Sequence, residues 1–171
     1  MLYHPGRNPT VDCIVTRNSG NDSQSETQVL WIRRSVHAHA EPGKWAFPGG
    51  FINTKARKNE KWISGEETEI AAVKRELVEE TDLNLSHYSE EEFILLGIYD
   101  NLERDPRNTS ERWIESHVFS ISIQKEEGNF VEGKDDAEDA KWFSLATILE
   151  MDKSQFAFDH YDLLLLYFGL N

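Results

Sequence analysis

Three glutamates stand close enough together in the sequence to bind a metal ion. Glu76, Glu79 and Glu80 fall on one face of a helix at about 100° per residue. Three carboxylates so close repel one another, and a hard cation such as Mg²⁺, which takes oxygen ligands, relieves that repulsion. Two such ions could bind a pyrophosphate and activate a water molecule. A solvated acidic face has the same spacing, so spacing alone leaves both interpretations open.

A helix over residues Glu66–Thr81 must position these glutamates. Ser64 can cap it, and Glu67, three residues further on, can complete a capping box. The apolar residues that recur at helical spacing and predict its buried stripe are Ile70, Val73 and Leu77.

The segment before this helix could bring backbone oxygens to the same ion. Residues 45–50 read WAFPGG, and two glycines after a proline allow tight backbone turns and a close approach of a carbonyl to an ion. An ordinary turn has the same composition. The two motifs together are much more specific than either one alone.

With both motifs in place, the chain resembles the Nudix hydrolases. Their signature is Gly, five residues, Glu, seven residues, then Arg-Glu-U-x-Glu-Glu-x-Gly-U, where U is apolar. Residues Arg75–Leu83 match the second half, except that Asp82 replaces the final glycine, and Glu67 lies at the matching distance. Sixteen residues separate Gly50 from Glu67 where the family has five, so an insertion of eleven residues lies inside the motif, within Asn53–Gly65. Asp tolerates left-handed backbone geometry, so the helix can still end at Asp82.

The resemblance implies roles for the matching residues. The metal ligands would be Glu76, Glu79, Glu80 and the main-chain carbonyl of Gly50, and the implied cofactor is Mg²⁺, with Mn²⁺ as a substitute. Arg75 would orient a glutamate of the helix. Glu67 would be structural and paired with Arg75.

The general base differs among the subfamilies, so two alternatives stay open. One is a glutamate of the helix, where Glu76 and Glu80 join Arg75 in the catalytic centre. The other is a carboxylate on a later loop, where Asp135 and Asp136 stand at the place the family often uses. An acidic surface loop would have the same composition.

A second segment resembles the ADP-ribose pyrophosphatases within the family. Residues 104–109 read RDPRNT, and residues 113–116 read WIES. Arginine has a planar fork that grips phosphate oxygens with two hydrogen bonds, so Arg104 and Arg107 could anchor a diphosphate or the terminal ribose. Together with Glu115 they are the predicted substrate-binding residues. Two solvent-facing arginines would give the same pattern.

Composition limits the class of protein. The chain has 171 residues, 18 of them Lys or Arg and 31 Asp or Glu, which gives a net charge of −13. We expect a single domain over residues 1–171. The negative charge argues against binding to nucleic acid or to an anionic membrane. A single cysteine, Cys13, excludes an internal disulfide, and neither a signal peptide nor a membrane-spanning run is evident, so we expect a cytoplasmic protein.

The remaining pattern favours a mixed sheet covered by helices. Two further helices are expected at residues 144–151 and 156–168. Strands are expected at residues 10–16, 28–33, 51–52, 93–99, 113–123 and 140–143. The resemblance implies the Nudix α/β/α sandwich with a mixed central sheet.

The implied activity is Mg²⁺-dependent hydrolysis of ADP-ribose to AMP and ribose 5-phosphate. A second hypothesis keeps the chemistry and replaces the substrate by another nucleoside diphosphate derivative, such as NADH or a nucleotide sugar. A third is a non-hydrolytic sensor domain that binds ADP-ribose. In each case the partner is a small molecule linked to a nucleoside diphosphate, and the resemblance leaves a homodimer open.

Overall fold

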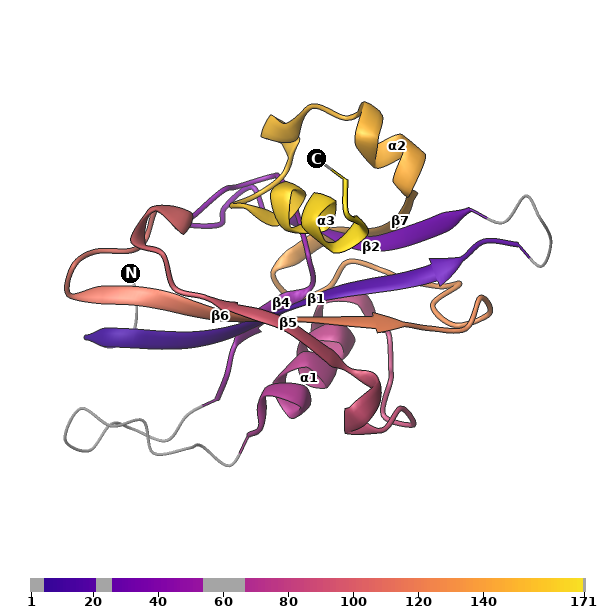
Figure 1. Ribbon diagram of the computed structural model, residues 1–171, viewed down its shortest axis with the longest axis horizontal. Helices are drawn as coiled ribbons and strands as arrows, with labels where there is room; N and C mark the ends of the chain where they lie inside the picture. Colours follow the sequence, from indigo (N-terminus) through magenta and orange to yellow (C-terminus); the bar gives the residue numbers. More distant parts are fainter. Residues whose placement is uncertain (1–4, 21–25, 54–66, 171) are drawn as a thin grey trace.

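The centre of the molecule is a mixed β-sheet (Figure 1). The computed structural model describes residues 5–20, 26–53 and 67–170, so Ser64 and the predicted insertion after Asn53 lie outside the described residues. The strands are β1 Gly6–Asn18, β2 Thr27–Arg34, β3 Trp45–Ala46, β4 Gly49–Phe51, β5 Ile94–Tyr99, β6 Arg112–Ser122 and β7 Ala137–Ser144. Their order is β3-β2-β1-β6-β5, with β4 paired to β1 and β7 to β2.

The β1 strand organises the sheet. It runs parallel to β6 from the pair Gly6 and Arg112 to the pair Thr16 and Ser122, whereas the other strand pairs are antiparallel. Because side chains alternate along a strand, β1 supplies apolar residues to both faces of the sheet. A strand buried on both faces needs a layer on each side.

Helices cover the two faces of this sheet. On one face lies α1 (Glu69–Thr81), and on the other lie α2 (Leu145–Glu150) and α3 (His160–Phe168) (Figure 1). These layers confirm the expected α/β/α sandwich with a mixed central sheet. The described helices are too short or too polar to cross a membrane.

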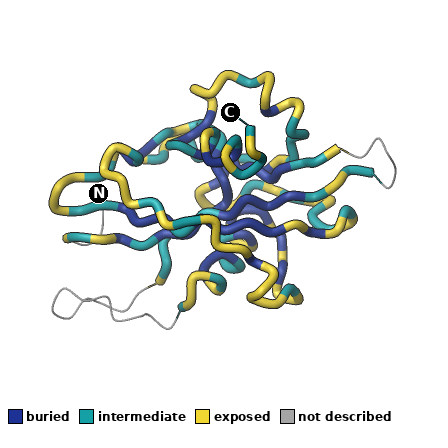
Figure 2. Tube along the Cα trace, viewed as in Figure 1, coloured by how far each residue is buried: buried dark blue, intermediate teal, exposed yellow. Residues whose placement is uncertain are grey.

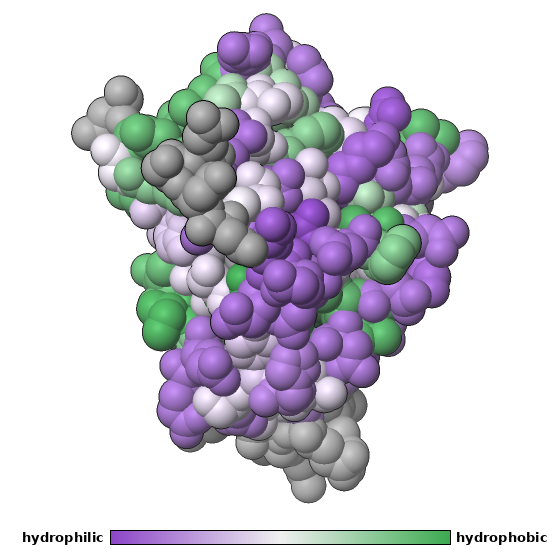
Figure 3. All heavy atoms as spheres, turned by 90° about the vertical axis from the view of Figure 1, so that its right-hand side faces the viewer, coloured by the Kyte–Doolittle hydropathy of each residue, from purple (hydrophilic) through white to green (hydrophobic). Residues whose placement is uncertain are grey.

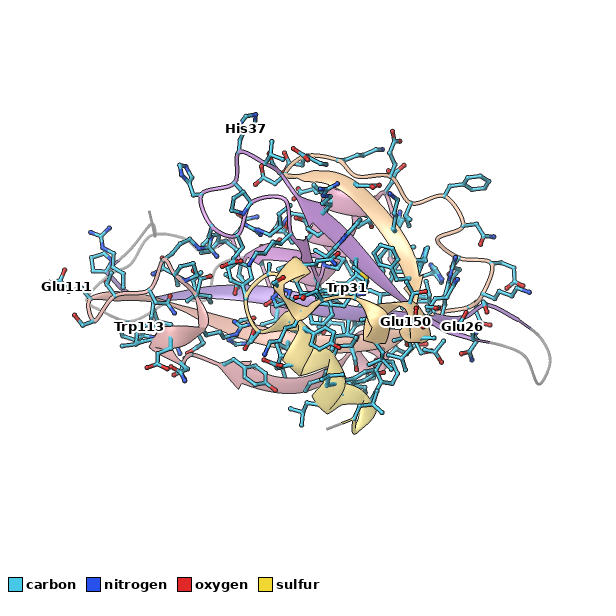
Figure 4. The ribbon with its side chains drawn as sticks, turned by 90° about the horizontal axis from the view of Figure 1, so that it is seen from above. Glu26, Trp31, His37, Glu111, Trp113 and Glu150 are labelled. Atoms are coloured by element: carbon cyan, nitrogen blue, oxygen red, sulfur yellow. The ribbon has the colours of Figure 1, made fainter. Side chains whose placement is uncertain are left out.

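The core is correspondingly divided into layers, and the buried parts of the chain follow the strands (Figure 2). Beneath α1, the strand residues Val11 and Cys13 pack against Val73 and Leu77. Beneath α2 and α3, Trp31 stacks on Phe47 with ring centroids 4.5 Å apart, near the middle of the molecule when it is seen from above (Figure 4). Hydrophilic side chains dominate the end of the molecule shown in Figure 3.

The start of α1 differs from the prediction. The helix begins at Glu69, and Thr68 caps it by accepting a hydrogen bond from the backbone N–H of Ala71 at 3.2 Å. The predicted capping role of Glu67 is therefore wrong, because this carboxylate bonds elsewhere, as shown below. The end of the helix is as predicted, since Asp82 adopts the left-handed conformation with φ of 61°.

Other boundaries also differ from the prediction, and the first is the start of β1 at Gly6 rather than at residue 10. The β7 strand begins at Ala137 rather than at residue 140. The α3 helix begins at His160 rather than at residue 156, because Ala157 donates its backbone N–H to the carbonyl of Trp45 and Phe158 has a φ of 54°. A short 3-10 helix, Lys153–Gln155, precedes this turn.

We expect Leu77→Ala to lower the free energy of unfolding by about 2–5 kcal/mol, since Leu77 is fully buried between α1 and the sheet. Urea denaturation followed by tryptophan fluorescence measures this change. Val78→Ala is the matched control, because Val78 is the next residue of the same helix and is exposed. An equal loss in both variants would contradict the assigned helix face.

Candidate active site

A cavity of about 600 Å³ lies beside β1 and β4, which is a size typical of small-molecule sites. Its lining comes from many parts of the fold, among them β1, the loop after β2, β4, α1, the segment around residues 104–107, the residues just before β7 and the start of α3. His37 marks the loop after β2 and projects outward from the edge of the molecule (Figure 4). Segments far apart in the sequence therefore meet at one place.

Arg75 connects the acidic residues of this cavity. Its Nε donates to Glu67 at 2.7 Å, and Nη1 donates to Glu76 at 2.7 Å and to Glu79 at 2.8 Å. Its Nη2 donates to the carbonyl of Phe51 in β4 at 2.9 Å. The hydrogen bond with Glu67 contributes most to raising the pKa of Arg75. The expected pair of Arg75 and Glu67 is thus present, and the hydrogen bond to Phe51 ties α1 to β4.

The two glycines of the WAFPGG segment allow β4 to approach α1. A Cβ atom on Gly50 would overlap the carboxylate of Glu76, and one on Gly49 would overlap the backbone carbonyl of Val11. Gly49 also donates its backbone N–H to Glu80 at 2.9 Å. Close approach is therefore the physical reason for glycine at both positions.

Of the three helix glutamates, Glu80 is buried and Glu76 beside it is half-buried. Burial raises the pKa of Glu80 well above its usual value, the N–H of Gly49 opposes this, and the charge of Glu76 adds to the rise. Burial likewise raises the pKa of Glu76, against the effect of Arg75. Positive charge on the protein is thus insufficient to keep these carboxylates at their ordinary acidity.

This donor set suits a hard divalent cation in type and location. All three glutamates and Gly50 line the cavity. Among the described residues, however, no three His, Cys, Asp or Glu side chains are grouped closely enough to enclose an ion as they stand. Arg75 holds one oxygen of Glu76 and one of Glu79, and the backbone N–H of Gly49 holds one oxygen of Glu80. The glutamate side chains must therefore rotate to meet on one ion.

The two arginines predicted from the RDPRNT segment also line the cavity, but carboxylates of the protein hold both of them. Arg104 is almost fully buried, and its Nε donates to the two oxygens of Asp159 at 2.9 and 2.8 Å. Arg107 donates from Nε and Nη2 to Asp105 at 2.9 and 2.7 Å.

The other predicted site residues divide between two places. Asp135 and Asp136 line the cavity. Glu115 is outside the described cavity lining, and its carboxylate pairs with Arg7 at 3.1 Å and with His117 at 3.0 Å. Neighbouring side chains of β6 point to opposite faces, so Ser116 reaches Asp12 in the cavity wall and Glu115 points away from it.

Sequence reasoning gave no site role to Asp12 or to His160. Asp12 accepts a hydrogen bond from Ser116 and lies 3.4 Å from Nη2 of Arg104 and 3.7 Å from Nε2 of His160. Burial would raise the pKa of Asp12, but the neighbouring His160 and Arg104, with the hydrogen bond from Ser116, outweigh it and lower the pKa. An aspartate inside the apolar run TVDCIVT was the available signal.

His160 helps to shape the cavity through its contacts with the backbone and with aromatic rings. Its Nδ1 accepts a hydrogen bond from the backbone N–H of Phe47 at 2.9 Å, and the two rings stack with centroids 4.7 Å apart. Burial lowers the pKa of His160, although Asp12 opposes that effect. Nothing in the local sequence around His160 indicates this long-range contact.

Comparison with known proteins gives matches over most of the chain. A family model described as the NUDIX domain matches residues 6–165. An ADP-ribose pyrophosphatase of Methanocaldococcus jannaschii is 33% identical over 138 residues, which cover 80% of this chain and 63% of that protein. An ADPR responsive transcriptional repressor, NtrR, of Acinetobacter baylyi is 28% identical, and the matched residues cover 82% of this chain and 46% of that protein. The chain therefore spans less than two thirds of either relative.

Solved structures give the same match in three dimensions. The NUDIX domain of Shewanella oneidensis NrtR complexed with ADP ribose has a TM-score of 0.69 and 25% identity, over 95% of this chain and 87% of that one. A bifunctional NMN adenylyltransferase/ADP ribose pyrophosphatase of Francisella tularensis, complexed with AMP and a Mn ion, has a TM-score of 0.73 and 27% identity, over 95% of this chain and 41% of that one.

We expect Glu80→Gln to raise the free energy of unfolding at neutral and alkaline pH, with EDTA present. Burial raises the pKa of Glu80, so stability linked to its proton is fully present below pH 4.5 and is lost as the pH rises through the folded-state pKa. The advantage of glutamine should therefore increase with pH.

Urea unfolding at several pH values measures this trend. Glu79→Gln is the control, since the Glu79 side chain is 44% exposed. A pH-independent difference between the wild type and Glu80→Gln would contradict the assigned environment of Glu80.

Proposed function

The chain belongs to the NUDIX domain family, and from this premise we propose that it is a metal-dependent hydrolase that converts ADP-ribose to AMP and ribose 5-phosphate. The observation that carries the proposal is the cluster of Glu76, Glu79 and Glu80 around Arg75 and Gly50, in one cavity. The family match agrees with the resemblance seen in the sequence motif.

The metal would be Mg²⁺, with Mn²⁺ as a substitute, and its ligands would be Glu76, Glu79, Glu80 and the carbonyl of Gly50. When bound, such an ion polarises phosphate oxygens and lowers the pKa of water. The fit rests on the oxygen donors and on the raised pKa of Glu76 and Glu80. The similar Francisella tularensis protein, whose structure is a complex with AMP and a Mn ion, supports it.

The chain's own residues orient the substrate and accept a proton. Arg75 fixes the positions of the helix glutamates through its hydrogen bonds to Glu76 and Glu79. For the base we retain two alternatives, Glu76 and Asp136. The loop that holds Asp136 is anchored, because the Asp136 carbonyl accepts the backbone N–H of Ser35 at 3.0 Å. The base must lie within hydrogen-bond reach of the attacking water. The geometry of the substrate-bound protein therefore decides between Glu76 and Asp136.

The choice of ADP-ribose rests on the RDPRNT segment and on the relatives. Arg104 and Arg107 lie in the cavity wall, where a diphosphate or a terminal ribose could contact them. The proposal keeps both as substrate contacts and drops Glu115, which points away. Several of the similar proteins are named for ADP-ribose or form a complex with it. Another nucleoside diphosphate derivative, such as NADH or a nucleotide sugar, is the alternative substrate.

A non-hydrolytic sensor domain is the second candidate function. The observation in its favour is the match with the repressor of Acinetobacter baylyi, whose name says that it responds to ADPR. The intact set of three glutamates and Arg75 favours hydrolysis instead. Calorimetry with ADP-ribose and Mg²⁺ separates the two functions, since a sensor binds the ligand and releases no product.

We expect the protein to release AMP from ADP-ribose in the presence of Mg²⁺ and to release none in EDTA. Chromatography of the nucleotide products measures this directly. The same assay on NADH and nucleotide sugars should give lower kcat/KM values than ADP-ribose. Faster turnover of either would replace the substrate assignment, and no turnover of any of them would refute the proposed activity.

We also expect Glu79→Gln to reduce kcat by orders of magnitude, because it removes a charged oxygen ligand from the cavity. Glu69→Gln is the matched control on the same helix, since Glu69 is exposed and lies outside the described cavity lining. Circular dichroism should show an unchanged fold in both variants. Wild-type turnover of Glu79→Gln would overturn the assignment of Glu79 as a metal ligand.

A further inference from the structure

We propose that His160 is a positioning residue of the glutamate cavity, and that its imidazole fixes the backbone which carries Gly49 and Gly50 against α1. Asp12 in turn orients the imidazole. The inference rests on the proposed function, because the carbonyl of Gly50 is one of the proposed metal ligands. It gives a role to a histidine that is buried in the cavity wall and that the proposed reaction does not otherwise use.

The hydrogen bond from Phe47 defines the protonation state of His160. A backbone N–H can only donate, so Nδ1, which accepts it at 2.9 Å, carries no proton. The imidazole is therefore neutral, and its proton is on Nε2. Burial lowers the pKa of His160, which favours this neutral form. Nε2 lies 3.7 Å from Oδ1 of Asp12, so the protonated nitrogen is the one beside the carboxylate.

Asp12 is itself held in place by two neighbours. Ser116 donates a hydrogen bond to its Oδ2, and Nη2 of Arg104 lies 3.4 Å from the same oxygen. Both neighbours contact Oδ2, so Oδ1 is the oxygen that faces His160. A carboxylate beside the protonated nitrogen of a histidine fixes the tautomer and the orientation of the ring.

Two aromatic rings contact the imidazole of His160. It stacks on Phe47 with centroids 4.7 Å apart and an angle of 12° between the rings, and the centroid of Phe158 lies 5.4 Å away. Phe47 is buried, so loss of the acceptor would leave a buried N–H group without its partner, which is unfavourable. His160 therefore makes two contributions that can be separated, a ring that packs and an atom that accepts a hydrogen bond.

The backbone after Phe47 connects this hydrogen bond to the proposed metal site. The carbonyl of Pro48 accepts a backbone N–H of β1 at 2.9 Å, and the N–H of Gly49 donates to Glu80 at 2.9 Å. His160 therefore anchors the start of a run of residues that enters β4 beside the helix glutamates.

The anchor at His160 does not depend on a metal ligand. Glu80 must rotate toward an ion, and its hydrogen bond to Gly49 then competes with that ion. The hydrogen bond between Phe47 and His160 involves none of the proposed ligands. It can thus hold the backbone that leads into β4 both before and after an ion binds.

The test separates the acceptor atom of His160 from its ring. Asparagine places its amide oxygen near the position of Nδ1, so His160→Asn keeps an acceptor for Phe47 and loses the stacked ring. His160→Phe keeps a ring and loses the acceptor. His117→Phe is the matched control, because the His117 side chain is 12% exposed, lies 3.0 Å from a carboxylate of Glu115 and is outside the described cavity lining.

Calorimetric titration with Mn²⁺ measures the affinity of the metal site without substrate. We expect His160→Phe to weaken Mn²⁺ binding by about 10–100-fold, the usual effect of removing a residue that orients a metal ligand. His160→Asn should bind Mn²⁺ more tightly than His160→Phe, and His117→Phe should bind it as the wild type does. Affinity that follows the acceptor rather than the ring is the signature of positioning.

Amide hydrogen exchange measured by NMR gives a second readout that needs neither metal nor substrate. Exchange at the N–H of Phe47 and of Gly49 should be faster in His160→Phe than in the wild type, because the backbone there opens more often. His160→Gln places its amide near the position of Nε2 instead of Nδ1. It replaces His160→Phe if that variant does not fold, and it should bind Mn²⁺ more weakly than His160→Asn.

Three results would overturn the positioning role. They are wild-type Mn²⁺ affinity in His160→Phe, tighter Mn²⁺ binding by His160→Phe than by His160→Asn, and unchanged amide exchange at Phe47 in His160→Phe. A wild type that binds no Mn²⁺ refutes the proposed function instead, and the exchange comparison then decides the role of His160 by itself.

Discussion

The close approach of β4 to α1 is the constraint on which the site depends. Gly50 lies where any side chain would overlap Glu76, and Arg75 bonds to the carbonyl of Phe51 next to it. The β4 strand is in turn fixed by pairing with the middle of β1. Packing of Leu77 against the sheet sets the depth of α1. The carboxylates therefore reach the cavity because the backbone and the core place α1 directly beside β4.

The distribution of charge around the cavity follows from that geometry. Arg75 neutralises the exposed end of the acidic cluster, whereas Glu80 lies deeper and has only the N–H of Gly49 as a hydrogen-bond donor among the described residues. On the other side of β1, Asp12 is balanced by Arg104 and His160. A fully paired network rigidifies the wall. The helix glutamates are only partly paired, so they are the groups whose negative charge a cation would balance.

The sequence alone predicts the parts of the site that lie within a single helix or strand. The spacing of the glutamates, the left-handed end at Asp82 and the mixed sheet with helices on both faces were all predicted, and the structure contains them. The start of α1 was misjudged because Glu67 finds Arg75 and Asn53 as partners across a gap in the sequence. His160 acquires its place in the cavity wall only through contacts with remote segments, which no local pattern encodes.

Departures from local rules concentrate around this one cavity. Glu80 is buried beside the half-buried Glu76, the guanidinium groups of Arg34 and Arg107 both lie over the ring of Phe158, and Phe158 is a bulky residue in left-handed backbone. Each of these costs stability in isolation. Sequences tolerate such conflicts where function requires them, and elsewhere local and global preferences agree. Because the acidic conflict calls for a cation and the basic one for an anion, a metal-bound diphosphate is the kind of ligand that would relieve both at once.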